Sequence, residues 1–117
     1  MVDKKILCVD DEETIRYFLS AALSDKGYAV DTAHDGQHAL DIWRPDISLL
    51  ITDIKMPRMN GFDLVERLRK DHPHLPIIML TGYNDYEQRA LEYGVDEFIT
   101  KPFDLNLLYS SVRRLLN

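Results

Sequence analysis

The chain has 117 residues, 45% of them hydrophobic, which is enough for one compact domain over residues 1–117 with a buried core. Its formal net charge of −6 excludes the basic face that direct binding to a nucleic acid backbone requires. No apolar run approaches the length of a membrane span, and the charged residues 3–5 leave no signal-peptide core, so we expect a cytoplasmic protein without a membrane segment.

The first half of the chain predicts two strand–helix pairs. Residues 6–9 are apolar throughout, as in a strand buried on both faces, and include the single cysteine, Cys8, as a buried thiol. Residues 12–26 predict a helix whose apolar side chains recur at helical spacing, namely Ile15, Phe18, Leu19, Ala22 and Leu23. Residues 29–33 predict a shorter strand, and residues 37–43 a short helix.

The middle of the chain contains a buried strand that ends in an acid. Residues 49–51 are apolar, Asp53 follows them, and Pro57 prevents the strand from continuing. Residues 59–61 have the composition of a turn, and residues 62–70 predict a helix. Open α/β sheets bind their ligands at the carboxyl ends of strands, which is where Asp53 is expected.

The last part of the chain predicts two further strand–helix pairs. Residues 76–80 form an apolar strand, and residues 85–93 a short helix that Gly94 ends. Residues 98–100 form the fifth strand, and Asp104 caps a final helix with one apolar face. Five successive strand–helix pairs with short connections predict an α/β fold, a doubly wound parallel five-stranded sheet with helices on both faces.

This topology brings together side chains that lie far apart in the sequence. The predicted strands end in Asp10 and Asp11, in Asp53, in Thr81 and in Lys101. Because the strands are parallel, these ends meet along one edge of the sheet. We therefore expect three carboxylates, a hydroxyl and an ammonium group to form one site.

Such a site is suited to phosphoryl transfer. Three clustered carboxylates repel one another, and a bound cation relieves the repulsion. Ligands that are all oxygen favour a hard ion such as Mg2+, with Mn2+ as the alternative ion. An aspartate such as Asp53 can accept a phosphoryl group covalently, and the metal, Lys101 and Thr81 would stabilise its oxygens.

Four segments resemble the signatures of one protein family, in the family's order: residues 5–12, 53–61, 76–82 and 98–103. The chain resembles a response-regulator receiver domain of two-component signalling over essentially its whole length. This resemblance implies a flavodoxin-like sheet with strand order 2-1-3-4-5. It also implies a cis peptide bond between Lys101 and Pro102.

The resemblance also implies a role for each site residue. Asp53 would be the phosphorylated residue, and Mg2+ would be held by Asp10, Asp11, Asp53 and the backbone carbonyl of Lys55. Thr81 and Lys101 would stabilise the phosphoryl group. Thr81 would also act as a switch with Phe98, which would turn inward as the Thr81 hydroxyl moves toward the phosphoryl group. In the family, the positions of Lys55 and Tyr83 tune the phosphoryl lifetime.

The partners are implied by the resemblance too. A histidine kinase or phosphotransfer protein would supply the phosphoryl group, and the domain would catalyse its own phosphorylation and dephosphorylation. The fourth helix, fifth strand and fifth helix would form the output surface, which includes Tyr86 and Tyr93. This surface would contact an effector domain or downstream protein, or a second copy in a phosphorylation-dependent homodimer.

Two other functions have to be weighed. A pseudo-receiver is a binding module without phosphochemistry, but it would be expected to lack the acidic pair, the acceptor or the lysine. A small Mg2+-dependent phosphohydrolase would need a second acid two residues after the nucleophile on the first strand, whereas Asp10 and Asp11 are adjacent. A zinc site is not expected, because the histidines lack ligand spacing with a cysteine; they are His34, His38, His72 and His74.

Overall fold

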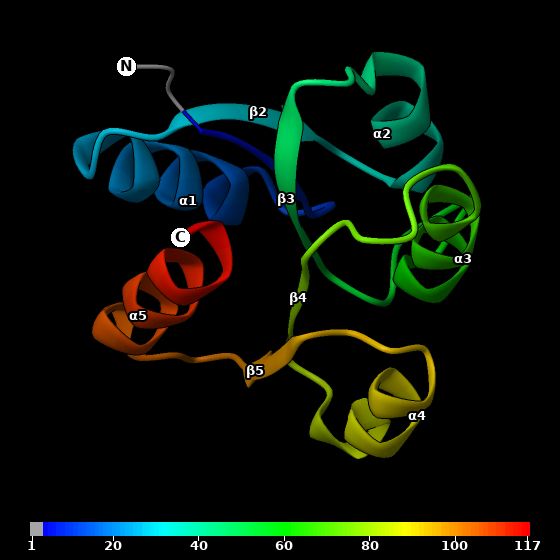
Figure 1. Cartoon of the computed structure of the whole chain (residues 1–117). Coiled ribbons are helices and arrows are strands. Elements are labelled where there is room, and N and C mark those ends of the chain that lie inside the picture. Colours follow the sequence, from blue (N-terminus) through cyan, green and yellow to red (C-terminus); the bar gives the residue numbers. More distant parts are fainter. Residues whose placement is uncertain (1–3) are drawn as a thin grey trace.

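In the computed structural model, which describes residues 4–117, five strands alternate with five α-helices (Figure 1). The strands are β1 (Lys5–Val9), β2 (Ala29–Ala33), β3 (Ile47–Thr52), β4 (Ile77–Thr81) and β5 (Glu97–Thr100). The helices are α1 (Glu13–Asp25), α2 (Gly36–Ile42), α3 (Gly61–Asp71), α4 (Glu87–Glu92) and α5 (Leu105–Leu116). No helix within residues 4–117 combines the length and apolar character that crossing a membrane would take.

The strands form one parallel sheet in the order β2-β1-β3-β4-β5, which confirms the predicted fold. Since all pairs are parallel, the carboxyl ends of the strands lie along one edge. In the centre of the sheet Val9 of β1 pairs with Thr52 of β3. The residues that follow them, Asp10 and Asp53, are therefore neighbours.

The helices cover the sheet in two layers (Figure 1). The side chains of β1 alternate between the layers, as the geometry of a strand requires. Ile6 and Cys8 pack in the core beneath α1 and α5, whereas Leu7 and Val9 pack in the core shared with α2, α3 and α4. The predicted buried thiol is confirmed, and burial raises the pKa of Cys8 to about 12.

Helix ends use the expected residues. Asp104 caps α5 by accepting the backbone N–H of Asn106 over 2.8 Å. Gly27 follows α1 with a φ of 93°, and Gly94 follows α4 with a φ of 76°. Both values lie in the left-handed region that favours glycine, so the two predicted helix ends are confirmed.

Two elements, β3 and α4, begin more than one residue away from their predicted positions. β3 begins at Ile47 because its backbone pairs with Lys5, although the polar Ser48 interrupts the apolar run that the prediction used. The helix expected over residues 85–93 is a 3-10 turn, Asn84–Tyr86, followed by the short α4. The turn contains an i to i+3 bond from the Tyr86 N–H to the carbonyl of Tyr83.

Phe18, one of the apolar side chains at helical spacing, does not lie on the buried face of the first helix. Leu19 and Leu23 of α1 are buried, whereas Phe18 is 45% exposed. The Phe18 ring lies at the edge of the apolar stripe, where it contacts the ring of Phe103 at a centroid distance of 6.1 Å instead of the sheet. The apolar stripe of α1 that packs against the sheet is therefore narrower than the helical spacing of the apolar residues suggests.

Candidate functional site

Four predicted site residues meet at the carboxyl edge of the sheet. Asp10 follows β1, Asp53 follows β3, Thr81 ends β4 and Lys101 follows β5. Backbone bonds hold these ends in place, since the Asp53 N–H donates to the Val9 carbonyl over 2.9 Å and the Lys101 N–H to the Thr81 carbonyl over 2.7 Å. The predicted cis bond between Lys101 and Pro102 is also present.

The ammonium of Lys101 joins the two buried acids. Its Nζ lies 2.7 Å from Oδ2 of Asp10 and 3.2 Å from Oδ2 of Asp53. The other oxygens are occupied by backbone donors, because Oδ1 of Asp10 accepts the Glu12 N–H over 2.9 Å and Oδ1 of Asp53 accepts the Ile54 N–H over 2.6 Å. Lys101, which the prediction placed in the site, therefore offsets part of the expected repulsion among the carboxylates.

Burial changes the ionisation of both partners. Burial raises the pKa of Asp10, and the bonds from Lys101 and the Glu12 amide offset this only in part. Burial by itself would lower the pKa of Lys101, but the bond to Asp10 and the charges of Asp53 and Asp10 raise it overall. Lys101 is therefore a fixed cation at neutral pH, and Asp10 is protonated more easily than a free aspartate.

Asp11 completes a group of carboxylates that fits a metal ion. One carboxylate oxygen from each of Asp10, Asp11 and Asp53 lies within 4.8 Å of the others. Asp10 and Asp53 are buried, whereas Asp11 is exposed and gives the group a solvent-facing side. The donors are all oxygen, as hard divalent cations such as Mg2+ prefer. The residues present therefore fit the ion that the sequence predicts.

The β3–α3 loop, residues 53–60, is closed tightly over Asp53. A Cβ at Gly61 would lie 2.1 Å from the carbonyl oxygen of Asp53, so only glycine fits there. The Gly61 N–H donates to the Ile54 carbonyl over 2.8 Å, and Asn60 caps α3 by accepting the Asp63 N–H over 2.9 Å. The start of α3 thereby holds the residue that the sequence identifies as the acceptor.

Sequence reasoning missed an ion pair between a buried carboxylate and an exposed arginine that ties this loop to α2. Asp35 is fully buried and caps α2 by accepting the His38 N–H over 2.8 Å. Its Oδ2 accepts from Nε of Arg58 over 3.0 Å and also from Nη2 of the same guanidinium. The sequence Asp35-Gly36 is typical of the start of a helix, so the cap could have been predicted. The ion-pair partner of Asp35, however, lies 23 residues away in the chain. Only the folded topology brings Arg58 to it.

Asp35 is expected to make the fold sensitive to acid. Burial opposes its ionisation, but the His38 amide, the Arg58 guanidinium and His34 outweigh burial and lower the pKa to about 2. Because the pKa of Asp35 is lower in the folded state than its value of about 4 in the unfolded chain, ionised Asp35 stabilises the fold. This stabilisation is complete above about pH 4 and is lost as the pH falls to about 2. Between about pH 5 and pH 2, urea unfolding should lose about 2 kcal/mol more in wild type than in Asp35→Asn. Equal losses in both proteins would contradict this.

Neither of the two predicted switch residues forms a hydrogen bond with the Asp53 side chain, which is bonded to the Ile54 N–H and to Lys101. Thr81 is fully buried, and its hydroxyl accepts the Tyr83 N–H over 3.3 Å. The prediction has Phe98 turn inward from solvent, whereas here its ring is already half-buried against the core beneath α2, α3 and α4. Lys55 contacts the aromatic face of Tyr83, with Nζ 4.4 Å from the ring centre. This last contact was not predicted.

The histidines form no metal-type cluster with each other or with acids in the described part of the chain. The rings of His34 and His38 stack at 4.1 Å, and His72 packs against Trp43 with the ring centres 5.0 Å apart. Trp43 ends α2 and packs onto the core.

An apolar cleft of about 410 Å3 opens beside the carboxylates. It is lined by Glu12, Ile15, Phe18, Lys101, Pro102 and Phe103. Lys101 reaches from this cleft to Asp10 and Asp53, so an apolar surface and the charged site share one residue. Phe18 is exposed and Phe103 is half-buried, and apolar surface next to a polar site is typical of a region that a partner covers.

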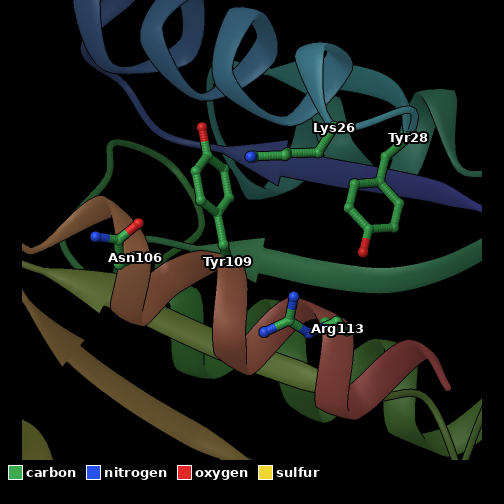
Figure 2. Close-up of a pocket in the computed structure, with 5 residues that line it drawn as sticks. All are labelled: Lys26, Tyr28, Asn106, Tyr109 and Arg113. Carbon is green, nitrogen blue, oxygen red and sulfur yellow. The ribbon is translucent and has the colours of Figure 1, made fainter.

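Another hollow, of about 360 Å3, lies where the end of α1 faces α5. Figure 2 shows the side chains that line it. Its lining residues are Lys26, Tyr28, Asn106, Tyr109 and Arg113. The Lys26 ammonium lies 4.7 Å from the centre of the Tyr109 ring, and the Tyr109 hydroxyl donates to the Ala22 carbonyl over 3.4 Å. None of the residues that line this hollow belongs to the predicted phosphoryl-transfer site.

Comparison with known proteins agrees with this geometry. The response regulator MprA of Mycobacterium avium (strain 104) is 40% identical over 117 residues, an alignment that covers 96% of this chain and 50% of that protein. The chain spans about half the length of the curated relatives it matches.

Solved structures share the fold. A response regulator receiver domain protein from Clostridium thermocellum superposes with a TM-score of 0.90 at 33% identity, covering 97% of this chain and 94% of that one. The response regulator protein TrrA from Thermotoga maritima, solved in complex with Mg(2+)-BeF, superposes with a TM-score of 0.88 at 36% identity. The superposition covers 97% of this chain and 99% of that one. The family model of the response regulator receiver domain matches residues 6–113. The chain therefore belongs to the response regulator receiver domains of two-component systems.

Proposed function

We propose that this receiver domain accepts a phosphoryl group on Asp53 from a histidine kinase or phosphotransfer protein, with Mg2+ bound beside the acceptor. The observation that carries the proposal is the contact of Lys101 with both Asp10 and Asp53, in a group of three carboxylates. This arrangement places an anionic nucleophile next to a fixed cation and a set of metal ligands. The domain acts in the cytoplasm, where such donors are found.

In the proposed reaction one carboxylate oxygen of Asp53 attacks phosphorus. The bond between phosphorus and the donor histidine nitrogen breaks, and that nitrogen leaves with the electron pair. When bound, Mg2+ supplies charge stabilisation to the phosphoryl oxygens, and Asp10, Asp11, Asp53 and the Lys55 carbonyl would hold it. Lys101 donates to a phosphoryl oxygen in place of Oδ2 of Asp53. The same groups position water for the slower dephosphorylation.

The apolar cleft beside Lys101 is the proposed docking place for the donor. Phe18 and Phe103 line it and expose aromatic surface next to the acceptor. A donor that buries these rings would bring its phosphohistidine to Asp53 without covering the carboxylate oxygens. The cleft therefore provides affinity, while the charged site provides chemistry.

The proposed output surface is formed by α4, β5 and α5. A phosphoryl group on Asp53 gives the Thr81 hydroxyl a strong acceptor, and its movement vacates space behind β4. The half-buried ring of Phe98 completes its turn into that space, which changes the surface around Tyr86 and Tyr93. The readout is contact with an effector domain or downstream protein, or a phosphorylation-dependent homodimer.

Beryllofluoride, a phosphoryl mimic, tests this switch without turnover. We expect amide NMR shifts at the strand ends and also around Phe98 and α4 in wild type. Thr81→Ala should keep the first set and lose most of the second, whereas Thr100→Ala, a change at an exposed position on β5, should keep both. Shifts confined to the strand ends in wild type would refute the switch.

No observation favours a pseudo-receiver without phosphochemistry. Such a binding module would have no need of the acidic pair, the acceptor and the lysine, and here all of them lie in contact or within metal-binding reach. A phosphohydrolase is disfavoured by the same geometry, because the candidate nucleophile follows the third strand rather than the first.

The metal requirement tests the proposed function directly. Mg2+ at about 100 times its dissociation constant should stabilise the folded protein by about 2.7 kcal/mol, seen as a rise in melting temperature. Asp11→Ala should lose most of this response, whereas Glu66→Ala, an exposed acid on α3, should keep it. Phosphorylation by acetyl phosphate should likewise require Mg2+. An equal Mg2+ response in wild type and Asp11→Ala would count against the site.

A further inference from the structure

The ion pair between Asp35 and Arg58 reaches the β3–α3 loop from a different part of the fold. We infer that Arg58 is a positioning residue for the Mg2+ site, acting through Asp35 on the loop that carries the Lys55 carbonyl. This inference rests on the proposed function, because it concerns metal affinity at Asp10, Asp11 and Asp53. It assigns a role to Asp35, which lies outside the family signatures on which the resemblance rests, and to Arg58, to which the resemblance gives no role.

The pair has the features of a fixed anchor. The Asp35 side chain is only 1% exposed, and both of its oxygens are occupied. Oδ1 caps α2 through the His38 N–H, so the carboxylate is attached to a rigid element. Oδ2 accepts from two nitrogens of Arg58 and lies 3.3 Å from Nδ1 of His34. A planar guanidinium held at two nitrogens has little freedom to swing.

The backbone of Arg58 needs such an anchor. Its φ is 68°, and within residues 4–117 it is the one residue other than glycine with a positive φ. A long side chain is disfavoured in this left-handed region, so the conformation persists where surrounding contacts enforce it. The contact with Asp35 holds the side chain of Arg58, and the backbone bond from the Met59 N–H to the Pro57 carbonyl over 2.8 Å closes the turn around it. Without it, the backbone at Arg58 would relax toward negative φ and change the path of the loop.

Two close approaches leave the loop little room to absorb such a change. A Cβ at Gly36 would lie 2.8 Å from the Met59 carbonyl oxygen, so the loop rests directly on the start of α2. At the other end, Gly61 packs against the Asp53 carbonyl. The segment between Asp53 and Arg58 includes Lys55, and a shift at Arg58 is therefore passed to the Lys55 carbonyl.

The expected consequence is weaker metal binding with an otherwise intact site. Residues that support metal ligands from outside the coordination sphere affect affinity when they are changed. Arg58 is exposed enough that its removal does not open the core, since its side chain is 64% exposed. The variants should lose some metal-free stability, because the buried Asp35 carboxylate loses its partner, but they should remain folded at neutral pH, so that Mg2+ affinity can be compared on folded protein.

Four variants separate the ion pair from the backbone effect. Arg58→Gly removes the guanidinium and leaves a residue that adopts a positive φ freely. Arg58→Ala also removes the guanidinium but keeps a Cβ, which disfavours a positive φ. Arg58→Lys keeps a cation, and Asp35→Asn keeps the helix cap while removing the charge that binds Arg58. Mg2+ affinity is measured by amide NMR titration, and metal-free stability by thermal unfolding.

We expect Arg58→Gly, Arg58→Ala and Asp35→Asn each to weaken Mg2+ binding by roughly tenfold, with Arg58→Lys closer to wild type. The double variant Arg58→Gly with Asp35→Asn should be no weaker than the worse single variant, because both changes break one interaction. Arg114→Ala breaks a surface ion pair with Glu97 far from the loop and should leave Mg2+ affinity unchanged.

The outcomes distinguish this inference from the proposed function. If wild type binds Mg2+, Asp11→Ala abolishes binding and the Arg58 and Asp35 variants bind as wild type does, the positioning role is wrong and the proposed function stands. If Arg58→Gly alone retains full affinity, the backbone conformation matters and the ion pair does not, which also overturns the inference. If wild type shows no Mg2+ binding at the carboxylates, both the inference and the proposed function fail.

Discussion

Asp53→Asn is expected to abolish specific phosphorylation of the domain. Acetyl phosphate and Mg2+ should add one phosphoryl group to wild type, seen by intact-protein mass spectrometry. The amide keeps the shape of the side chain but lacks the nucleophilic carboxylate oxygen, so the rate of addition should fall by roughly 100-fold or more. The neighbouring acids do not substitute, because Asp10 is held by Lys101 and the Glu12 amide.

The control for this experiment is Asp104→Asn. Asp104 is an exposed acid that caps α5, and asparagine is an equally good cap, so this variant should be phosphorylated as wild type is. Full labelling of Asp53→Asn would show that another residue accepts the phosphoryl group. Loss of labelling in both variants would show that the effect is not specific to residue 53.

Among the possible substitutions of a glycine by alanine, Gly61→Ala is expected to cause the largest loss of stability. The added Cβ would meet the backbone oxygen of Asp53 at 2.1 Å, and backbone cannot rotate away as a side chain can. The start of α3 or the end of β3 must shift, and the bond from Gly61 to Ile54 weakens. We expect a loss of about 3 kcal/mol in the free energy of unfolding, measured in urea, with slower phosphorylation of the residual folded protein.

Gly82→Ala is the matched control. A Cβ at Gly82 meets nothing within 4 Å, and its φ lies outside the left-handed region. Its unfolding free energy should stay within about 0.5 kcal/mol of wild type. If Gly61→Ala is as stable as Gly82→Ala, then the loop over Asp53 is not packed as tightly as described.

Much of the fold follows from local patterns in the sequence. The apolar runs, the glycines at helix ends and the cap at Asp104 predict the elements and their order, because each depends on residues close together in the chain. The parallel topology then predicts which side chains meet, and Asp10, Asp53 and Lys101 do meet. This step needs no knowledge of side-chain geometry, since strand ends alone place the residues.

What the sequence does not predict are the pairings that depend on side-chain reach. Lys101 was expected beside the site, but its bond to two buried acids depends on the length and direction of its side chain. Arg58 and Asp35 lie in different loops, and neither has a pattern that names the other. The exposure of Phe18 likewise depends on where α1 meets the loop before α5, which helical spacing does not report.

Reductive trapping tests the central claim most directly. Borohydride reduces an acyl phosphate to an alcohol, so it converts a phosphorylated aspartate to homoserine and leaves free carboxylates unchanged. Wild type treated with acetyl phosphate and Mg2+, trapped, digested and sequenced by tandem mass spectrometry should carry homoserine at position 53, and no homoserine should form without Mg2+. Homoserine at position 10 or 11, or none anywhere in a protein that has gained a phosphoryl mass, would contradict phosphorylation of Asp53.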